Sequence, residues 1–124
     1  MNESDREEYR LAALASGLEI EIKEVTLASP LSSTGTYKTE FAYVRYGGLV
    51  REWNPKTKKA DSFDLMVDCN IIGGFSKIEQ KAMAVHPYSW VECEAGGHDA
   101  AADDLMQAIF NCAVAIGRSM EQSQ

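Results

Sequence analysis

Two spacings of hydrophobic residues alternate along the chain, one typical of helices and the other of strands. Leu11, Leu14 and Leu18 recur at helical spacing near the N-terminus. The segment 4–7 (Ser-Asp-Arg-Glu) matches a capping box, in which serine and glutamate side chains satisfy free backbone amides of the first helical turn. These features predict an N-terminal helix that ends near Gly17, because glycine readily adopts the left-handed conformation that terminates helices.

An alternation of period two follows and predicts strands. Ile20 and Ile22 alternate with charged residues, as in a half-buried strand. Residues 29–36 have the composition of a loop, and residues 37–46 are rich in aromatic and β-branched side chains. Two adjacent glycines separate that segment from residues 49–53, and such a pair supplies the positive φ angles of a tight hairpin turn.

The second half of the chain predicts two helices and two further strands. The first is a helix over 61–70, with Asp61 as its cap and an apolar side formed by Phe63, Met66, Val67 and Ile71. A chain break at Gly73-Gly74 and strands over 81–86 and 89–94 follow. The last element is a helix over 99–119, whose apolar stripe is Leu105, Ile109, Cys112, Ala113, Ile116 and Met120. The fold class is therefore α+β, with a small antiparallel sheet covered by helices and an N-terminal helix and hairpin. A core in 124 residues seldom divides, so we expect a single domain in which 1–50 form an N-terminal extension.

Charge and hydropathy narrow the class of partner. The chain has 19 acidic and 12 basic residues, for a net charge of −7. No direct binding of nucleic acid is expected, because phosphate neutralisation needs clustered lysine and arginine. No apolar run approaches the roughly 20 residues that cross a bilayer, and the acidic N-terminus lacks the features of a signal peptide. We therefore expect a cytoplasmic protein with no membrane partner.

No recognisable catalytic or metal-binding motif occurs in the sequence. Cys69, Cys93 and Cys112 are widely spaced among apolar neighbours, which favours small buried side chains over disulfides or zinc ligands. His86 and His98 are interpreted as structural or solvent-facing. A nucleophilic pair of Cys93 and His98 is the alternative, and its spacing across a glycine turn gives it weak support. We expect no catalysis, no cofactor and no metal.

Two segments have the composition of an anion site. Gly96-Gly97-His98 precedes a helix, where free backbone amides can bind phosphate, but the aspartates of the first turns would repel an anion. Lys56, Lys58 and Lys59 lie close together before another predicted helix, although a solvated loop is the simpler interpretation.

Binding a nucleotide requires at least an aromatic surface on which the base can stack and one or two arginines. Trp53 and Trp90 lie at the ends of predicted strands, where a large ring can be half exposed. Arg118 also has a structural interpretation, as a cation near the C-terminus of a helix. The candidate ligand-binding residues are Arg51, Trp53, Asn54, Phe75, Trp90 and Arg118.

The second half of the chain resembles the phage ABA-sandwich domain. The similar features are Arg51-Glu52-Trp53-Asn54-Pro55, followed by Asp61 and the apolar segment 63–67, and the end of the last helix, Cys112-Ala113-Val114-Ala115-Ile116-Gly117-Arg118. The resemblance covers about residues 51–120, so that 51–124 form the sandwich-like part. The lysines at 56, 58 and 59 depart from the acidic or glycine-rich loop typical of that family.

The resemblance implies a bacteriophage or prophage origin and a location in the infected bacterial host. Thoeris anti-defence sponge proteins are similar in size and in their sheet-plus-long-helix plan, and they sequester a cyclic ADP-ribose isomer without cleaving it. The leading hypothesis is therefore a sponge for a nucleotide-type immune signal, working as a homo-oligomer with the pocket between subunits. The alternative is an acidic protein that inhibits a host defence complex by direct protein–protein binding.

Overall fold

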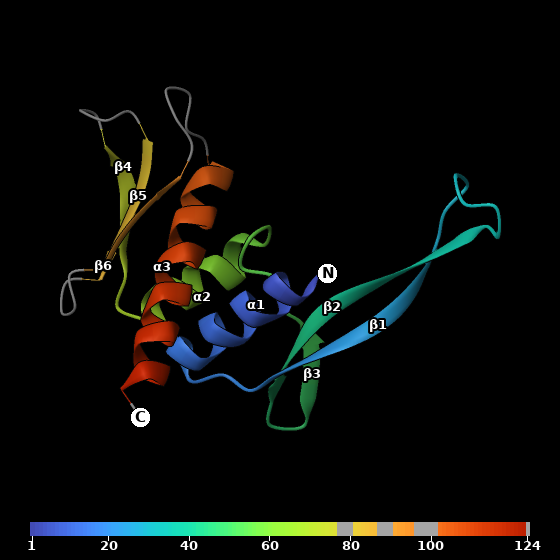
Figure 1. Cartoon of the computed structure of the whole chain (residues 1–124), viewed down its shortest axis with the longest axis horizontal. Helices are drawn as coiled ribbons and strands as arrows, with labels where there is room; N and C mark the ends of the chain where they lie inside the picture. The colour runs from blue at the N-terminus through green and yellow to red at the C-terminus, as the bar shows by residue number, and fades with distance from the viewer. Residues whose placement is uncertain (77–80, 87–90, 96–101, 124) are drawn as a thin grey trace.

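The fold combines helices with two separate antiparallel sheets (Figure 1). The structure is a computed structural model of the whole chain, and it describes residues 1–76, 81–86, 91–95 and 102–123. The elements in these ranges are α1 (Glu3–Ser16), β1 (Ile20–Ala28), β2 (Thr36–Tyr46), β3 (Leu49–Glu52), α2 (Lys59–Asp68), β4 (Ile72–Ser76), β5 (Lys81–His86), β6 (Val91–Ala95) and α3 (Ala102–Gln122). The α+β class and the packing of small antiparallel sheets against helices are confirmed.

The first sheet has the strand order β1-β2-β3. The sequence pattern predicts strands in this segment and the glycine turn that connects β2 to β3. Tyr46 pairs with Leu49 across the predicted glycine turn, where Gly47 has a φ of 59°. Ile20 and Ile22 of β1 lie opposite buried residues of β2 and pack against the core. The predicted strand and the predicted hairpin are therefore confirmed.

Helix α1 ends where the pattern predicts and begins earlier. Gly17 terminates it in the left-handed conformation, with a φ of 75°. Its N-cap is Asn2 rather than Ser4: the Asn2 side chain accepts from the Asp5 amide, and the Asp5 carboxylate accepts from the Asn2 amide. The capping box is real but lies two residues nearer the N-terminus, because Asn is as good an N-cap as Ser.

The second sheet, with strand order β4-β5-β6, contains the largest error of the sequence-based prediction. Gly73 and Gly74 do not break the chain; they lie within β4, paired with Ala84 and Met83 of β5. A Cβ at Gly73 would lie 3.3 Å from Leu105 Cδ1 of α3, so glycine lets the helix approach the strand closely. Small buried Ala82 and Ala84 serve the same approach from β5.

Helix α3 is the centre of the core and contacts α1, α2 and the second sheet. In the predicted apolar stripe, Ile109, Cys112 and Ala113 are buried, Leu105 and Ile116 are partly buried against the core, and Met120 is 39% exposed. Phe110 and Val114 are buried as well, because the helix is covered on more than one side. None of the helices in the described ranges is long and apolar enough to cross a membrane.

Helix α2 is rotated from its predicted orientation. Asp61 does not cap it: the N-cap is Lys58, without a side-chain cap, and the Asp61 side chain is buried at 1% exposure. Phe63 and Val67, predicted to be core residues, are 60% and 56% exposed, whereas Leu65 is buried. Asp61 and Leu65 therefore lie on the inward face of α2. Asp61 can be buried there because hydrogen-bond donors compensate the loss of water around its carboxylate.

Candidate functional site

The buried carboxylate of Asp61 joins β3, the following turn and α2. Its Oδ1 accepts a hydrogen bond from the Arg51 guanidinium at 2.7 Å, in an ion pair whose arginine side chain is 45% exposed. Its Oδ2 accepts from the backbone amide of Asn54 at 2.9 Å. Two donors on one carboxylate explain how a charged group tolerates the interior.

The side chain of Asn54 extends this network to α1. Its Oδ1 accepts from the Tyr9 hydroxyl at 3.0 Å and from the Lys56 amide at 3.2 Å. Burial raises the pKa of the Tyr9 hydroxyl to about 12, so it stays protonated and donates at physiological pH. The predicted site residues Arg51 and Asn54 are thus brought together, but their described polar contacts bind the chain to itself.

Trp53 is a core residue at 2% exposure, so the prediction of a half-exposed ring is wrong for it. The ring packs edge-on against Tyr9, with 6.0 Å between centroids. Lys56 places its ammonium over the Tyr9 and Phe110 rings, 5.4 and 4.8 Å from their centroids, and Lys58 pairs with Glu52. Two of the three loop lysines are therefore engaged within the chain rather than grouped around an anion.

The other predicted site residues come from different parts of the molecule. Phe75 is 53% exposed on β4 and lines a shallow hollow with Ile72 and Met83. Arg118 is exposed on α3. Its charge makes a small contribution to lowering the pKa of the Glu7 carboxyl, which is lowered chiefly by hydrogen bonds from Arg10. Trp90, the Cys93–His98 pair and the Gly96-Gly97-His98 segment involve positions outside the described residues.

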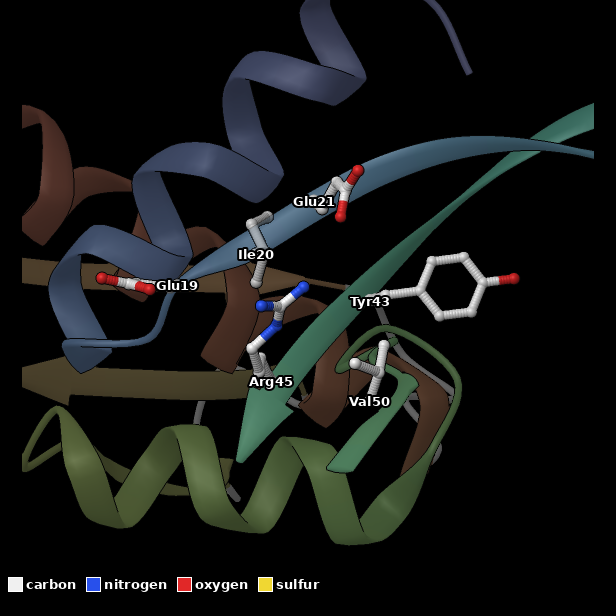
Figure 2. A pocket seen from close by; sticks show the side chains of 6 residues that line it. All are labelled: Glu19, Ile20, Glu21, Tyr43, Arg45 and Val50. Atoms are coloured by element: carbon white, nitrogen blue, oxygen red, sulfur yellow. The ribbon is translucent and has the colours of Figure 1, made fainter. Parts of the chain in front are cut away.

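A hollow on the outer face of the first sheet is lined by Arg45, which is not among the candidate residues selected from the sequence. Figure 2 shows Arg45 of β2 with its guanidinium beside Ile20, while the Tyr43 ring points away from it. The hollow measures about 200 Å³, and Glu19 and Glu21 also line it. That volume is below the roughly 300–1,000 Å³ of typical ligand pockets, and two carboxylates disfavour a diphosphate.

A wider groove of about 430 Å³ lies between α1 and β1. Its arginines are already paired: Arg6 with Glu40, and Arg10 with both Glu7 and Glu121. An anion entering this groove would have to displace a carboxylate from each guanidinium. The groove is therefore a poor anion site.

Helix α2 presents an apolar pair to solvent, which we call the α2 face: Phe63, Asp64, Val67 and Asp68. Phe63 and Val67 lie one helical turn apart and are both more than half exposed. Asp64 and Asp68 are exposed beside them and form no ion pair within the described part of the chain. Sequence reasoning missed this face because apolar residues at helical spacing normally turn inward.

Two cysteines are expected to be unreactive in the folded protein. Burial raises the pKa of Cys69 and of Cys112 to about 12, well above the roughly 8.5 of an exposed thiol. Iodoacetamide at pH 8 should label both cysteines in the folded protein at least ten times more slowly than in urea.

The same burial predicts a pH dependence of stability. Because the folded chain keeps thiol protons that the unfolded chain loses, the free energy of unfolding should fall as pH rises from about 8.5 towards 12. Thermal melts across this range would show it, with a shallower slope in Cys69→Ala; equal labelling in folded and unfolded protein would contradict the burial.

Within residues 1–76, 81–86, 91–95 and 102–123, no group of three or more histidine, cysteine or acidic side chains is placed to hold a metal ion. Comparison with protein-family models, with curated proteins and with solved structures finds no match to this chain.

Proposed function

We propose that this chain is a non-catalytic protein that binds another protein directly and inhibits it, with the α2 face as the contact. The observation that carries the proposal is the outward position of Phe63 and Val67, 60% and 56% exposed on one side of a helix whose opposite side is buried. A helix with anchors at i and i+4 is a recurring way of filling an apolar groove on a partner.

The charges beside these anchors define the partner's chemistry. Asp64 and Asp68 would meet a basic rim around the groove, and the net charge of −7 would accelerate association with such a partner. The resemblance to phage ABA-sandwich proteins supports a host defence complex of the infected bacterium as the target. Arg51, Trp53, Asn54 and Asp61 have a structural role in this account, since they join the helix that bears the contact to the first sheet.

A second candidate is the sequestration of a nucleotide-type signal such as a cyclic ADP-ribose isomer. It is favoured by Arg45, which forms no ion pair with any described residue and lies in the hollow of Figure 2. The small volume of the hollow and its two glutamates rank this candidate second. A phage or prophage origin and a cytoplasmic location are common to both candidates.

The test compares variants of the α2 face with a matched control. The full chain captures partners from host lysate, mass spectrometry identifies one, and calorimetry measures the affinity of the purified pair. Phe63→Glu is expected to weaken binding at least tenfold, because it removes an anchor and places a carboxylate in the apolar groove of the partner. Leu49→Glu, at a leucine of the first sheet that is 76% exposed, should leave the affinity unchanged.

Circular dichroism would check that both variants keep the fold. The proposal is wrong if Phe63→Glu binds the partner as tightly as the unmodified chain. Stabilisation by cyclic ADP-ribose isomers in a thermal-shift assay, lost in Arg45→Ala, would instead establish the second candidate.

A further inference from the structure

The distal part of the β1–β2 hairpin projects away from the rest of the molecule (Figure 1). We call residues 23–41 the arm. Beyond its own hairpin, β1 contacts α1. The Arg6 guanidinium donates three hydrogen bonds to the Glu40 carboxylate and so holds the base of the arm against the helix.

The apolar positions of the hairpin change sides at the start of the arm. In β1, Ile20 and Ile22 are partly buried, Lys23 and Glu24 are both exposed, and the partly buried residues resume at Val25 and Leu27. The pairing of β1 with β2 continues without a bulge from Ile20↔Val44 to Ala28↔Thr36. Because side chains alternate strictly along a regular strand, the apolar residues of the arm face away from the side that packs on the core.

The arm is therefore an amphipathic ribbon. The side continuous with the core-facing side of the sheet carries Glu24, Thr26, Lys38 and Glu40. The opposite side, which we call the outer face of the arm, carries Val25, Leu27, Tyr37, Thr39 and Phe41, with Lys23 at its base. A two-stranded ribbon is marginally stable in water by itself, and three strands or a packing partner are normally required. In Figure 1 the distal part of the arm projects away from the other described elements.

Charge identifies what covers it. Within the arm, Lys23 and Lys38 balance Glu24 and Glu40, so the whole charge of −7 lies in the remainder of the chain. Two copies repel one another through that remainder, and the arm is where this repulsion is absent. The arm has no net charge, so it offers no electrostatic attraction to a strongly charged partner. A two-fold interface brings the same surface of two copies together. Two neutral apolar faces can pack in this way, whereas two acidic faces would repel each other.

We infer that the outer faces of two arms pack against each other in a symmetric dimer of this chain. The arm strands extend about 20 Å from the body, too little to bury the roughly 800 Å² per partner of a standard stable interface. The dimer should accordingly be reversible, with a dissociation constant in the micromolar range. This inference concerns the purified chain alone and does not depend on the partner of the α2 face.

Sedimentation equilibrium over a hundredfold range of concentration tests the dimer. The unmodified chain should shift from 13.7 kDa towards twice that mass. Leu27→Lys should weaken association at least tenfold, because it places a second ammonium group on the outer face of each arm. Thr26→Lys, its neighbour on the opposite side of the same strand, should leave the association constant within about twofold.

A second measurement uses the unmodified sequence and so avoids variants that unfold the hairpin. In a mixture of isotope-labelled and unlabelled copies, intermolecular nuclear Overhauser effects should join the Val25 and Leu27 methyl groups to the Tyr37 and Phe41 rings. The inference is overturned if the chain stays at the monomer mass at the highest concentration. It is equally overturned if Leu27→Lys associates like the unmodified chain, or if the intermolecular contacts come from other residues.

Discussion

Replacing Gly117 by alanine is expected to lower the free energy of unfolding by about 3 kcal/mol, the upper part of the range for overpacked cores. A Cβ at this position would lie 2.0 Å from the Leu11 carbonyl oxygen of α1, and both atoms belong to helices that pack directly together. A backbone oxygen cannot rotate away as a side chain can, so α1 and α3 would have to separate. The loss should appear even though alanine is intrinsically better than glycine in a helix by about 1 kcal/mol.

Urea denaturation of Gly117→Ala measures this effect, and Gly74→Ala is its control. Gly74 has open space where its Cβ would lie and does not require a positive φ. Gly74→Ala should therefore stay within about 0.5 kcal/mol of the unmodified chain. A Gly117→Ala protein as stable as the control would mean that α1 and α3 do not meet as closely as described.

Removing the Asp61 carboxylate is the second large change. Asp61→Ala removes the carboxylate that accepts from the Arg51 guanidinium and from the Asn54 backbone amide, and it opens a small cavity beside α2. Loss of one member of a fully buried pair costs about 3–5 kcal/mol. Arg51 is partly exposed and water can replace its partner, so we expect about 2 kcal/mol.

Asp64→Ala is the matched control, because Asp64 lies on the same helix, is exposed, and forms no ion pair with another described residue. It should change the unfolding free energy by no more than about 0.5 kcal/mol. Equal effects of the two substitutions would show that the network at Asp61 contributes nothing specific. Asp64→Ala should still weaken binding through the α2 face, which separates stability from function.

The parts of the fold that could be predicted from sequence are those decided by local chemistry. Gly17 ends α1, the glycine turn closes the β2–β3 hairpin, and the acidic start and long stripe of α3 identify that helix. Strand β4 could not be predicted, because Gly73 is explained by the approach of Leu105, more than thirty residues away in the sequence. The same limit applies to α2, because the donors that bind the buried Asp61 carboxylate, Arg51 and the Asn54 backbone amide, lie outside this helix.

Only the part of the candidate site formed by residues close together in the sequence could be predicted. Arg51 and Asn54 do share a network, since they flank one turn. That Asp61 and Tyr9 complete this network follows from packing between elements and has no local signal. For the arm a signal did exist: two consecutive charged residues, Lys23 and Glu24, interrupt the alternation of β1 and mark the change of face.

The unbroken pairing of β1 with β2 also determines which changes of length the hairpin can accept. One residue added to each strand would keep every backbone pair but turn all side chains beyond the addition to the opposite side. Two residues added to each would lengthen the ribbon by about 7 Å and preserve its orientation. Homologues are therefore expected to differ in this segment by even numbers of residues per strand.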